Sequence, residues 1–205
     1  YNLFERVIST VVDEIRLYEE ETGRVVVRVC GVCGPVEQAV REAETARRLG
    51  FDAVLLSPGG LNALSEEDML DRTRAVAQVM PVIGFYLQTA VGGRVFSYDY
   101  WARLAEIEGV VAIKCASFNR YTTLDVVRAV SLSSRADQIA LYTGNDDNIV
   151  IDLLTRYRFE KDGKTVENGF RGGLLGHWSI WTAKVVEMFR MLRNAEPTAE
   201  LLTLA

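Results

Sequence analysis

The stretch PVIGFYLQTAVGGRVFSYDYWARLAEIEGVVAIK at residues 81–114 carries the pattern that decides the fold. Its first six and last six residues are compact apolar runs of strand length, and the apolar side chains of residues 97–107 recur at helical spacing. A strand, a helix and a second strand in this order form a βαβ unit with parallel strands. Neither run alternates between apolar and polar residues, so both faces of each strand are expected to be buried.

The same unit recurs along the chain at a regular step. The apolar runs begin near residues 25, 52, 81, 110, 138 and 169, so consecutive starts lie 27 to 31 residues apart. Helical patterns are predicted within the first 18 residues and at residues 36–46, 69–80, 97–107, 122–130 and 146–157. Ser65 and Asp68 form the sequence pattern of a capping box before the third of these helices. The chain is therefore predicted to be an α/β protein.

Two architectures fit this pattern, an open doubly wound sheet and a closed (β/α)₈ (TIM) barrel. A doubly wound sheet normally has a Gly-x-Gly-x-x-Gly loop after its first strand, and no such loop is present. The regular step favours a barrel, which we expect to lack its first two strands and its C-terminal helices within residues 1–205. Residues 1–205 are predicted to form a single domain, with a hairpin inserted at residues 158–168 around Asp162 and Gly163. A further helix is expected to open within residues 194–205.

The composition excludes several classes of protein. The 205 residues carry a formal net charge of −5, and 49% of them are hydrophobic, which is typical of one ordinary globular domain. No apolar run approaches the ~20 residues that a membrane helix requires, and no basic cluster suggests nucleic-acid binding. Three cysteines and no secretory signal pattern favour the cytoplasm.

Lys114 is the most unusual residue of the sequence because it closes an otherwise apolar strand. Active sites of such barrels lie at the C-terminal ends of the strands. Burial should lower the pKa of this amine toward neutrality, and a neutral lysine can attack a carbonyl carbon to form a Schiff base. The alternative is an ammonium group that reaches solvent or pairs with a carboxylate. Tyr86 closes the preceding strand, where its phenol could relay protons or simply pack in the core.

Two weaker candidates follow other strands. Cys30 and Cys33 form a Cys-x-x-Cys motif, which in this setting can be a redox pair. His177, the chain's single histidine, follows the last strand and could contact a substrate or cap the next helix. With one histidine, no metal site is expected.

Several segments together resemble the dihydrodipicolinate synthase and N-acetylneuraminate lyase family of class I aldolases. These are residues 81–86, 100–107 and 109–117, with ungapped spacing from Tyr86 to Lys114. Residues 141–147 (LYTGNDD) are similar to the family's Gly-Asp-Asp turn, and residues 169–175 (GFRGGLL) to its last strand. The resemblance implies a TIM barrel in which Lys114 forms a Schiff base with pyruvate or another 2-oxo acid and Tyr86 shuttles protons. It also implies that no cofactor is needed and that the protein is a homo-oligomer, by analogy a tetramer.

Substrate contacts are expected from Gly144, Asn145, Leu174 and His177. The sequence also departs from the family pattern. The family's Gly-Thr-Thr loop belongs to a strand that this chain does not contain. Gly59 and Gly60 stand where synthases have a tyrosine, Val91 where they have an arginine, and Asn145 where the turn has its first acid.

The predicted function is that of a lyase or aldolase that makes or breaks a carbon–carbon bond of a 2-oxo acid. One alternative is a dehydratase of a 4-hydroxy-2-oxo sugar acid that uses the same imine. A second is a non-catalytic barrel that binds a small carboxylate, and a distant third is a redox protein that uses Cys30 and Cys33.

Overall fold

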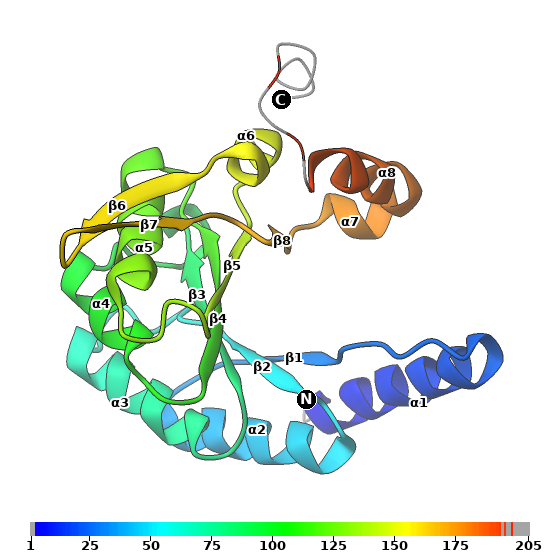
Figure 1. Cartoon of the computed structure of the whole chain (residues 1–205). Helices are drawn as coiled ribbons and strands as arrows, with labels where there is room; N and C mark the ends of the chain where they lie inside the picture. The colour runs from blue at the N-terminus through cyan, green and yellow to red at the C-terminus, as the bar shows by residue number, and fades with distance from the viewer. Residues whose placement is uncertain (1–2, 194, 196–197, 199–205) are drawn as a thin grey trace.

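The computed structural model describes residues 3–193, 195 and 198, and its centre is a six-stranded parallel sheet (Figure 1). The strand order is β1-β2-β3-β4-β5-β8, which follows the chain. The bounds are β1 (Val29–Val32), β2 (Ala53–Leu56), β3 (Val82–Leu87), β4 (Val110–Ala116), β5 (Ala140–Thr143) and β8 (Gly172–Gly173). A doubly wound sheet would reverse its strand order at a switch point, so this order confirms the barrel type of α/β fold. Within the described residues, β1 and β8 form the two edges of the sheet.

Helices cover the outer face of this sheet, as Figure 1 shows. Their bounds are α1 (Phe4–Thr22), α2 (Val36–Leu49), α3 (Glu66–Ala77), α4 (Tyr98–Ala105), α5 (Arg120–Leu132), α6 (Ile149–Leu154), α7 (His177–Ile180) and α8 (Thr182–Leu192), with a short 3₁₀ helix, η1 (Thr89–Val91). The predicted capping box is confirmed, because the Asp68 N–H donates to Ser65 Oγ and the Ser65 N–H donates to the Asp68 carboxylate. The sequence analysis did not predict α7 and α8. The helix that it placed within residues 194–205 lies outside the described residues, apart from residues 195 and 198.

The first strand differs from its predicted position. It was expected at residues 25–29 but spans Val29–Val32, because its partner β2 begins at Ala53 and the ladder starts at that pair. The three preceding valines misled the prediction, since Val25 is 91% exposed and Val27 is 74% exposed. An apolar run predicts a strand only where a neighbour supplies the hydrogen bonds.

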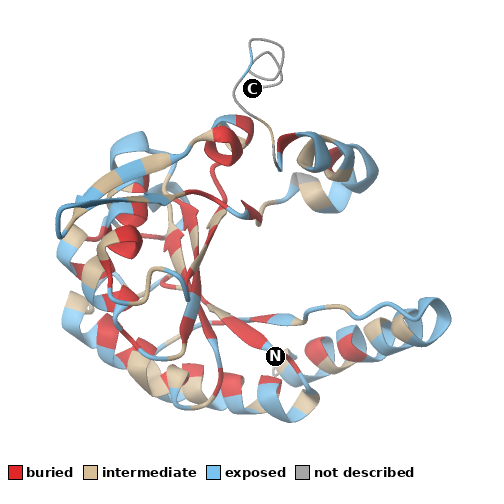
Figure 2. Ribbon diagram, in the orientation of Figure 1, coloured by how far each residue is buried: buried red, intermediate tan, exposed pale blue. Residues whose placement is uncertain are grey.

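The two faces of the sheet carry hydrophobic clusters of different size. Figure 2 shows buried residues along the strands and in the helices around them. Toward the helices lies the large core, with Trp101, Leu104 and Ile113 among its fully buried side chains. The inner face carries a much smaller cluster of Ala53, Ile83 and Ala112. Small side chains leave room on this inner face, where Tyr142 packs against the cluster.

Strands β6 (Tyr157–Lys161) and β7 (Lys164–Asn168) form a separate antiparallel hairpin. Its two-residue turn has positive φ at Asp162 (51°) and Gly163 (72°), the conformation that Asp-Gly turns favour. The hairpin packs on α5, and Lys161 Nζ donates to the Ser133 carbonyl oxygen (2.7 Å). It therefore lies on the outside of the sheet and away from its inner face.

Candidate active site

Lys114 lies on the inner face of the sheet, where it is half-buried. In the ladder it stands between Phe85 of β3 and Tyr142 of β5, and its Nζ lies 4.5 Å from the centroid of the Phe85 ring. Burial lowers the pKa of the Lys114 amine below its ordinary value, and the nearby Asp146 carboxylate partly opposes this shift. A larger share of the amine is therefore neutral near pH 7 than for a solvated lysine, as a nucleophilic role requires.

Gly144 lies beside Lys114, and the backbone of Leu174 lies beside Gly144. A Cβ atom at Gly144 would stand 2.9 Å from Lys114 Cε, 2.8 Å from Ala116 Cβ and 3.4 Å from the Leu174 carbonyl oxygen. Real Cβ atoms essentially never approach closer than 3.0 Å, so a side chain here would push the lysine away. Glycine is therefore required at position 144, because a residue without a side chain leaves room for the Lys114 side chain.

Tyr86 does not face Lys114, which corrects the position expected for a proton relay. Its side chain is 2% exposed and stacks on Trp101 with ring centroids 5.0 Å apart, in the core under the helices. Burial raises the pKa of its phenol, and Thr122 at the start of α5 and the Phe96 backbone partly oppose this shift. The residue opposite Lys114 on β3 is Phe85.

A shift of register explains why the sequence spacing misled. At the start of β3, Val82 pairs with Val110, and continuing that register would place Tyr86 opposite Lys114. The register shifts between Val82 and Ile83, so that Ile83 pairs with Ala112. The extra residue lies in β4, so Lys114 and the other following residues of this strand face the opposite side from the one that the starting register gives them, whereas Tyr86 keeps its place on the outer face. Ungapped spacing in the sequence therefore did not translate into facing side chains.

Asn145 also faces away from Lys114, contrary to the expected substrate contact. Its side chain is buried, accepts from the Phe118 N–H (2.9 Å) and donates to Thr123 Oγ1 (3.2 Å) and Asp152 Oδ2 (3.0 Å). These bonds use the amide's oxygen and both of its hydrogens, so it has little capacity left for a ligand.

Asp152 is the centre of this buried network. It is 0% exposed, accepts a 2.6 Å hydrogen bond from Thr143 Oγ1 and forms an ion pair with Arg120. Arg120 in turn donates to the Tyr157 hydroxyl (2.8 Å). The network joins β5, α5, α6 and the hairpin on the outer side of the sheet, so its role is structural.

Tyr142 is the residue on the inner face that the sequence analysis missed. It is half-buried, pairs with Lys114 on one side and with Gly172 on the other, and its ring lies 3.4 Å from the place of a Cβ at Gly172. Of the strand side chains that the structure describes on this face, those of Lys114 and Tyr142 alone can exchange protons. A usable signal was present, because Tyr142 precedes Gly144 by two residues and such residues share a face.

Arg72, also missed, lies under the loops at the carboxyl ends of β1 and β2. This α3 side chain is buried, and its guanidinium donates to the carbonyl oxygens of Gly34 (2.8 Å) and Ser57 (2.9 Å). It fixes the two loops that border the inner face.

The cysteine motif does not have the geometry of a redox pair. Cys30 is buried in the core, where burial raises the pKa of its thiol to about 11, whereas Cys33 is exposed. Burial and the Glu42 carboxylate raise the pKa of the Cys33 thiol as well. Both thiols are therefore protonated and unreactive near neutral pH.

Three remaining expectations concern His177, metals and membranes. His177 begins α7, but its side chain lies outside what the structure describes. Among the described residues, no group of three or more His, Cys, Asp or Glu side chains could hold a metal ion. Within the same residues, every helix is too short or too polar to cross a bilayer.

A parallel sheet in chain order, outer helices and a lysine on the inner face define a protein of the (β/α)₈-barrel class. The sequence model of the Dihydrodipicolinate synthetase family matches residues 7–156. The chain belongs to this family.

Individual relatives agree with this assignment. The 4-hydroxy-tetrahydrodipicolinate synthase of Acaryochloris marina is 32% identical over 120 residues, which are 58% of this chain and 39% of that protein. Two solved dihydrodipicolinate synthases share the fold. The Acinetobacter baumannii enzyme, complexed with pyruvate, has a TM-score of 0.72 at 20% identity over 93% of this chain and 60% of the other. The Bacteroides thetaiotaomicron enzyme has a TM-score of 0.75 at 18% identity over 100% and 61%. The chain thus spans about two fifths of that curated relative and about three fifths of these solved chains.

Proposed function

We propose that the protein is a class I aldolase or lyase that acts on a 2-oxo acid through a Schiff base at Lys114. The observation that carries this proposal is a half-buried amine of lowered pKa on the inner face of the sheet, next to the space that Gly144 leaves open. Family membership supports it, as does the pyruvate complex of the Acinetobacter baumannii enzyme. Of the expected substrate contacts, Gly144 adjoins the Lys114 side chain, and the Leu174 carbonyl oxygen lies close to Gly144.

The chemistry follows from the neutral amine. The Lys114 nitrogen attacks the keto carbon, and the resulting carbinolamine loses water to give a protonated imine. This imine accepts the electron pair released when the neighbouring carbon loses a proton, which yields an enamine. The enamine carbon then attacks an aldehyde carbon, whose oxygen takes up a proton, and water finally releases the lysine. The reverse sequence cleaves the same carbon–carbon bond.

Tyr142 is the residue that we assign to the proton transfers. Its phenol lies on the same face as Lys114, in the neighbouring strand and at the same level of the ladder. A phenol can donate a proton to the departing hydroxyl and take one from the substrate carbon. Tyr86 points into the helical core and takes no direct part.

The expected homotetramer rests on the family resemblance alone, whereas the expected cytoplasmic location rests on the three cysteines and the lack of a secretory signal pattern. Light scattering coupled to gel filtration measures the assembly directly. A mass of four chains would support it, whereas a monomer would contradict it.

Borohydride trapping tests the proposed chemistry. The protein is incubated with pyruvate and with longer 2-oxo acids, reduced with borohydride, and examined by intact mass and peptide mapping. We expect one reduced adduct, on Lys114, and none in Lys114→Ala. Lys184→Ala is the matched control, because Lys184 is an exposed lysine of α8 and its loss should leave the adduct unchanged.

Two results would decide against the proposal or refine it. A folded protein that gives no adduct with any 2-oxo acid would favour a binding barrel without catalysis. Where an adduct forms, loss of water from a 4-hydroxy-2-oxo sugar acid would identify a dehydratase, and release of an aldehyde would identify an aldolase.

A further inference from the structure

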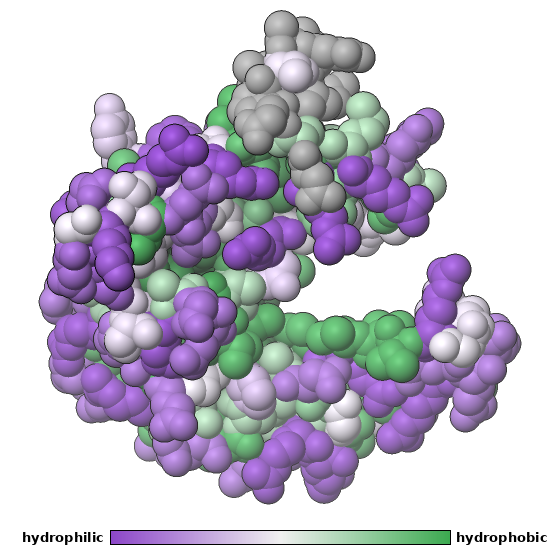
Figure 3. All heavy atoms as spheres, in the orientation of Figure 1, coloured by the Kyte–Doolittle hydropathy of each residue, from purple (hydrophilic) through white to green (hydrophobic). Residues whose placement is uncertain are grey.

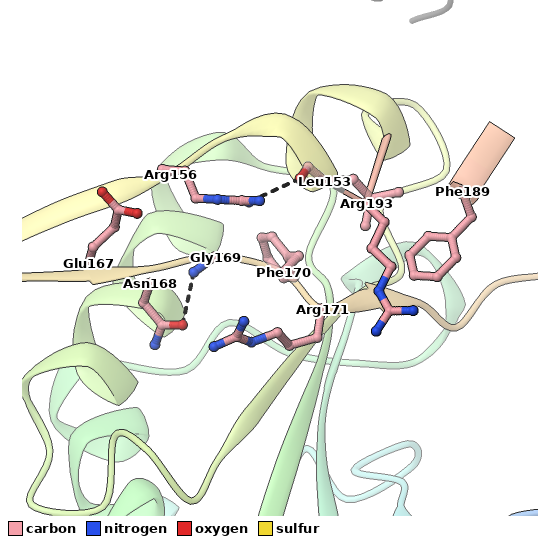
Figure 4. A pocket seen from close by; sticks show the side chains of 9 residues that line it. All are labelled: Leu153, Arg156, Glu167, Asn168, Gly169, Phe170, Arg171, Phe189 and Arg193. Carbon is pink, nitrogen blue, oxygen red and sulfur yellow. Dashed lines mark hydrogen bonds between the residues drawn. The ribbon is translucent and has the colours of Figure 1, made fainter. Parts of the chain in front are cut away.

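The outer side of the sheet holds a pocket of about 570 Å³ that the proposed chemistry does not use (Figure 4). It is formed by α6, by the segment that leads from β7 to β8 and by α8. Three arginines line it, and each comes from a different part of the chain. Arg156 precedes β6, Arg171 precedes β8 and Arg193 follows α8.

The sheet separates this pocket from Lys114. Gly172 pairs with Tyr142 and so belongs to the inner face. Arg171 is the residue before it, and its backbone N–H donates to the carbonyl oxygen of Leu141 (2.8 Å), whose side chain lies in the outer core. Leu153 and Phe170, which line the pocket, also belong to this outer core, so the pocket lies on the opposite side of the sheet from Lys114. A ligand here would therefore not occupy the place of the 2-oxo acid.

The positive charge of the pocket is not neutralised within the described part of the chain. None of the three guanidinium groups forms an ion pair there, and Glu167, the acidic residue of the lining, pairs with Arg158 (2.9 Å). Arg156 donates to the Leu153 carbonyl oxygen (3.2 Å), which leaves most of its N–H groups available. The three arginines are exposed and give this concavity a local positive charge, in a chain whose net charge is −5.

The floor of the pocket is formed by buried residues, and a glycine there allows one of the arginines to approach closely. Phe170 is 4% exposed, and Tyr157 packs edge-on against it with ring centroids 6.5 Å apart. A Cβ atom at Gly169 would stand 2.8 Å from the Thr155 carbonyl oxygen and 3.3 Å from Arg156 Nη1. The glycine thus allows Arg156 to lie directly against the segment that carries Arg171. Figure 4 shows the three arginines around Phe170.

We propose that this pocket binds a compact multivalent oxyanion of the phosphate type, such as a small phosphate or diphosphate compound. A guanidinium group presents paired donors that match the oxygens of phosphate, and three such groups exceed what a single carboxylate can satisfy. The attraction between the exposed arginines and the anion is electrostatic, so affinity falls as salt screens the charges.

Isothermal titration of the protein with inorganic pyrophosphate tests the proposal. We expect saturable binding at one site per chain, which Arg171→Gln and Arg193→Gln each weaken by about tenfold or more. The matched control is Arg190→Gln, because Arg190 is an exposed arginine of α8 outside the pocket and its loss should change affinity little. Acetate at the same ionic strength should not compete.

The opposite results would overturn the proposal. These are no saturable binding of pyrophosphate or of inorganic phosphate, equal losses in Arg190→Gln and Arg171→Gln, or full competition by acetate. Trapping of pyruvate on Lys114 is measured in the same variants and should be unchanged. Failure of that labelling in the wild-type chain would count against the proposed function and not against this site.

Discussion

The two faces of the sheet place neighbouring residues of the same strands in opposite environments. On the inner face, Lys114 stands between Phe85 and Tyr142, with few polar groups around it. On the outer face, Thr143 joins Asp152 in a network whose polar atoms bond to one another. The hydropathy view in Figure 3 shows hydrophilic side chains covering the helices of the outer layer.

This difference shows what separates a reactive polar residue from a structural one. A buried polar group whose hydrogen bonds are all made stabilises the fold and has no capacity left for a ligand. Lys114 is half-buried and forms no hydrogen bond or ion pair with the residues that the structure describes, so its pKa falls and its nitrogen stays available. Asn145 and Lys114 are both polar residues near strand ends. The hydrogen-bonding groups of Asn145 are used within the fold, whereas the Lys114 amine stays available for a ligand.

Asp152→Ala should produce the largest effect on the outer face. It leaves the buried donors of Thr143 and Asn145 without their acceptor, so we expect a loss of about 3 kcal/mol in the free energy of unfolding. Urea denaturation measures this, with Asp147→Ala as the control because Asp147 is exposed. A loss below that of the control would show that the network is not a source of stability.

A comparison of Tyr142→Phe with Tyr86→Phe tests which of the two phenols transfers protons in the reaction on the inner face. Loss of a positioned proton donor lowers rates by about a hundredfold or more, so Tyr142→Phe should slow formation of the trapped adduct by this factor. Tyr86→Phe should slow it much less, because its phenol lies in the outer core. Rapid-quench trapping with pyruvate gives both rates. A larger loss of trapping rate in Tyr86→Phe than in Tyr142→Phe would instead identify Tyr86 as the proton relay.

Asp146→Asn should produce the smallest effect, a change in pH dependence. The carboxylate raises the pKa of Lys114 and so opposes the effect of burial, and its removal should lower that pKa further. The amine reacts when neutral, so the rate rises with pH through this pKa, and the rise should move to lower pH. Near neutral pH we expect an increase of at most about fivefold. Trapping rates measured across pH give the position of this rise. An equal shift in Asp147→Asn would show that Asp146 has no specific effect on the pKa of Lys114.

Much of the fold could be predicted because its signals are local. Apolar runs at a regular step indicated parallel strands with helices between them, and the capping box at Ser65 and Asp68 marked the start of α3. Asp162 and Gly163 carried the local signal of a turn, and the hairpin of β6 and β7 is present there. The prediction failed where an apolar run lacked a hydrogen-bonding neighbour, as at Val25 and Val27.

The candidate site was predicted only in part. Lys114 was identifiable because the sequence alone shows a lysine within an apolar strand, and Gly144 was identifiable from its turn motif. Tyr86 and Asn145 were misplaced because the direction of a side chain depends on partners far along the chain. Asn145, for example, bonds to Thr123 and Asp152.

By itself, the sequence determined the repeating strand–helix unit, the family and the lysine, since each depends on residues that are close in the chain. Only the tertiary structure decided which face each of these residues occupies. The extra residue in β4 turned Lys114 to the inner face, where it pairs with Tyr142 of β5, whereas Tyr86 stayed in the outer core. The tertiary structure also gathered Arg156, Arg171 and Arg193 from three separate segments of the chain into one pocket. Strand register and the docking of helices are set by pairing between distant segments, which no local pattern encodes.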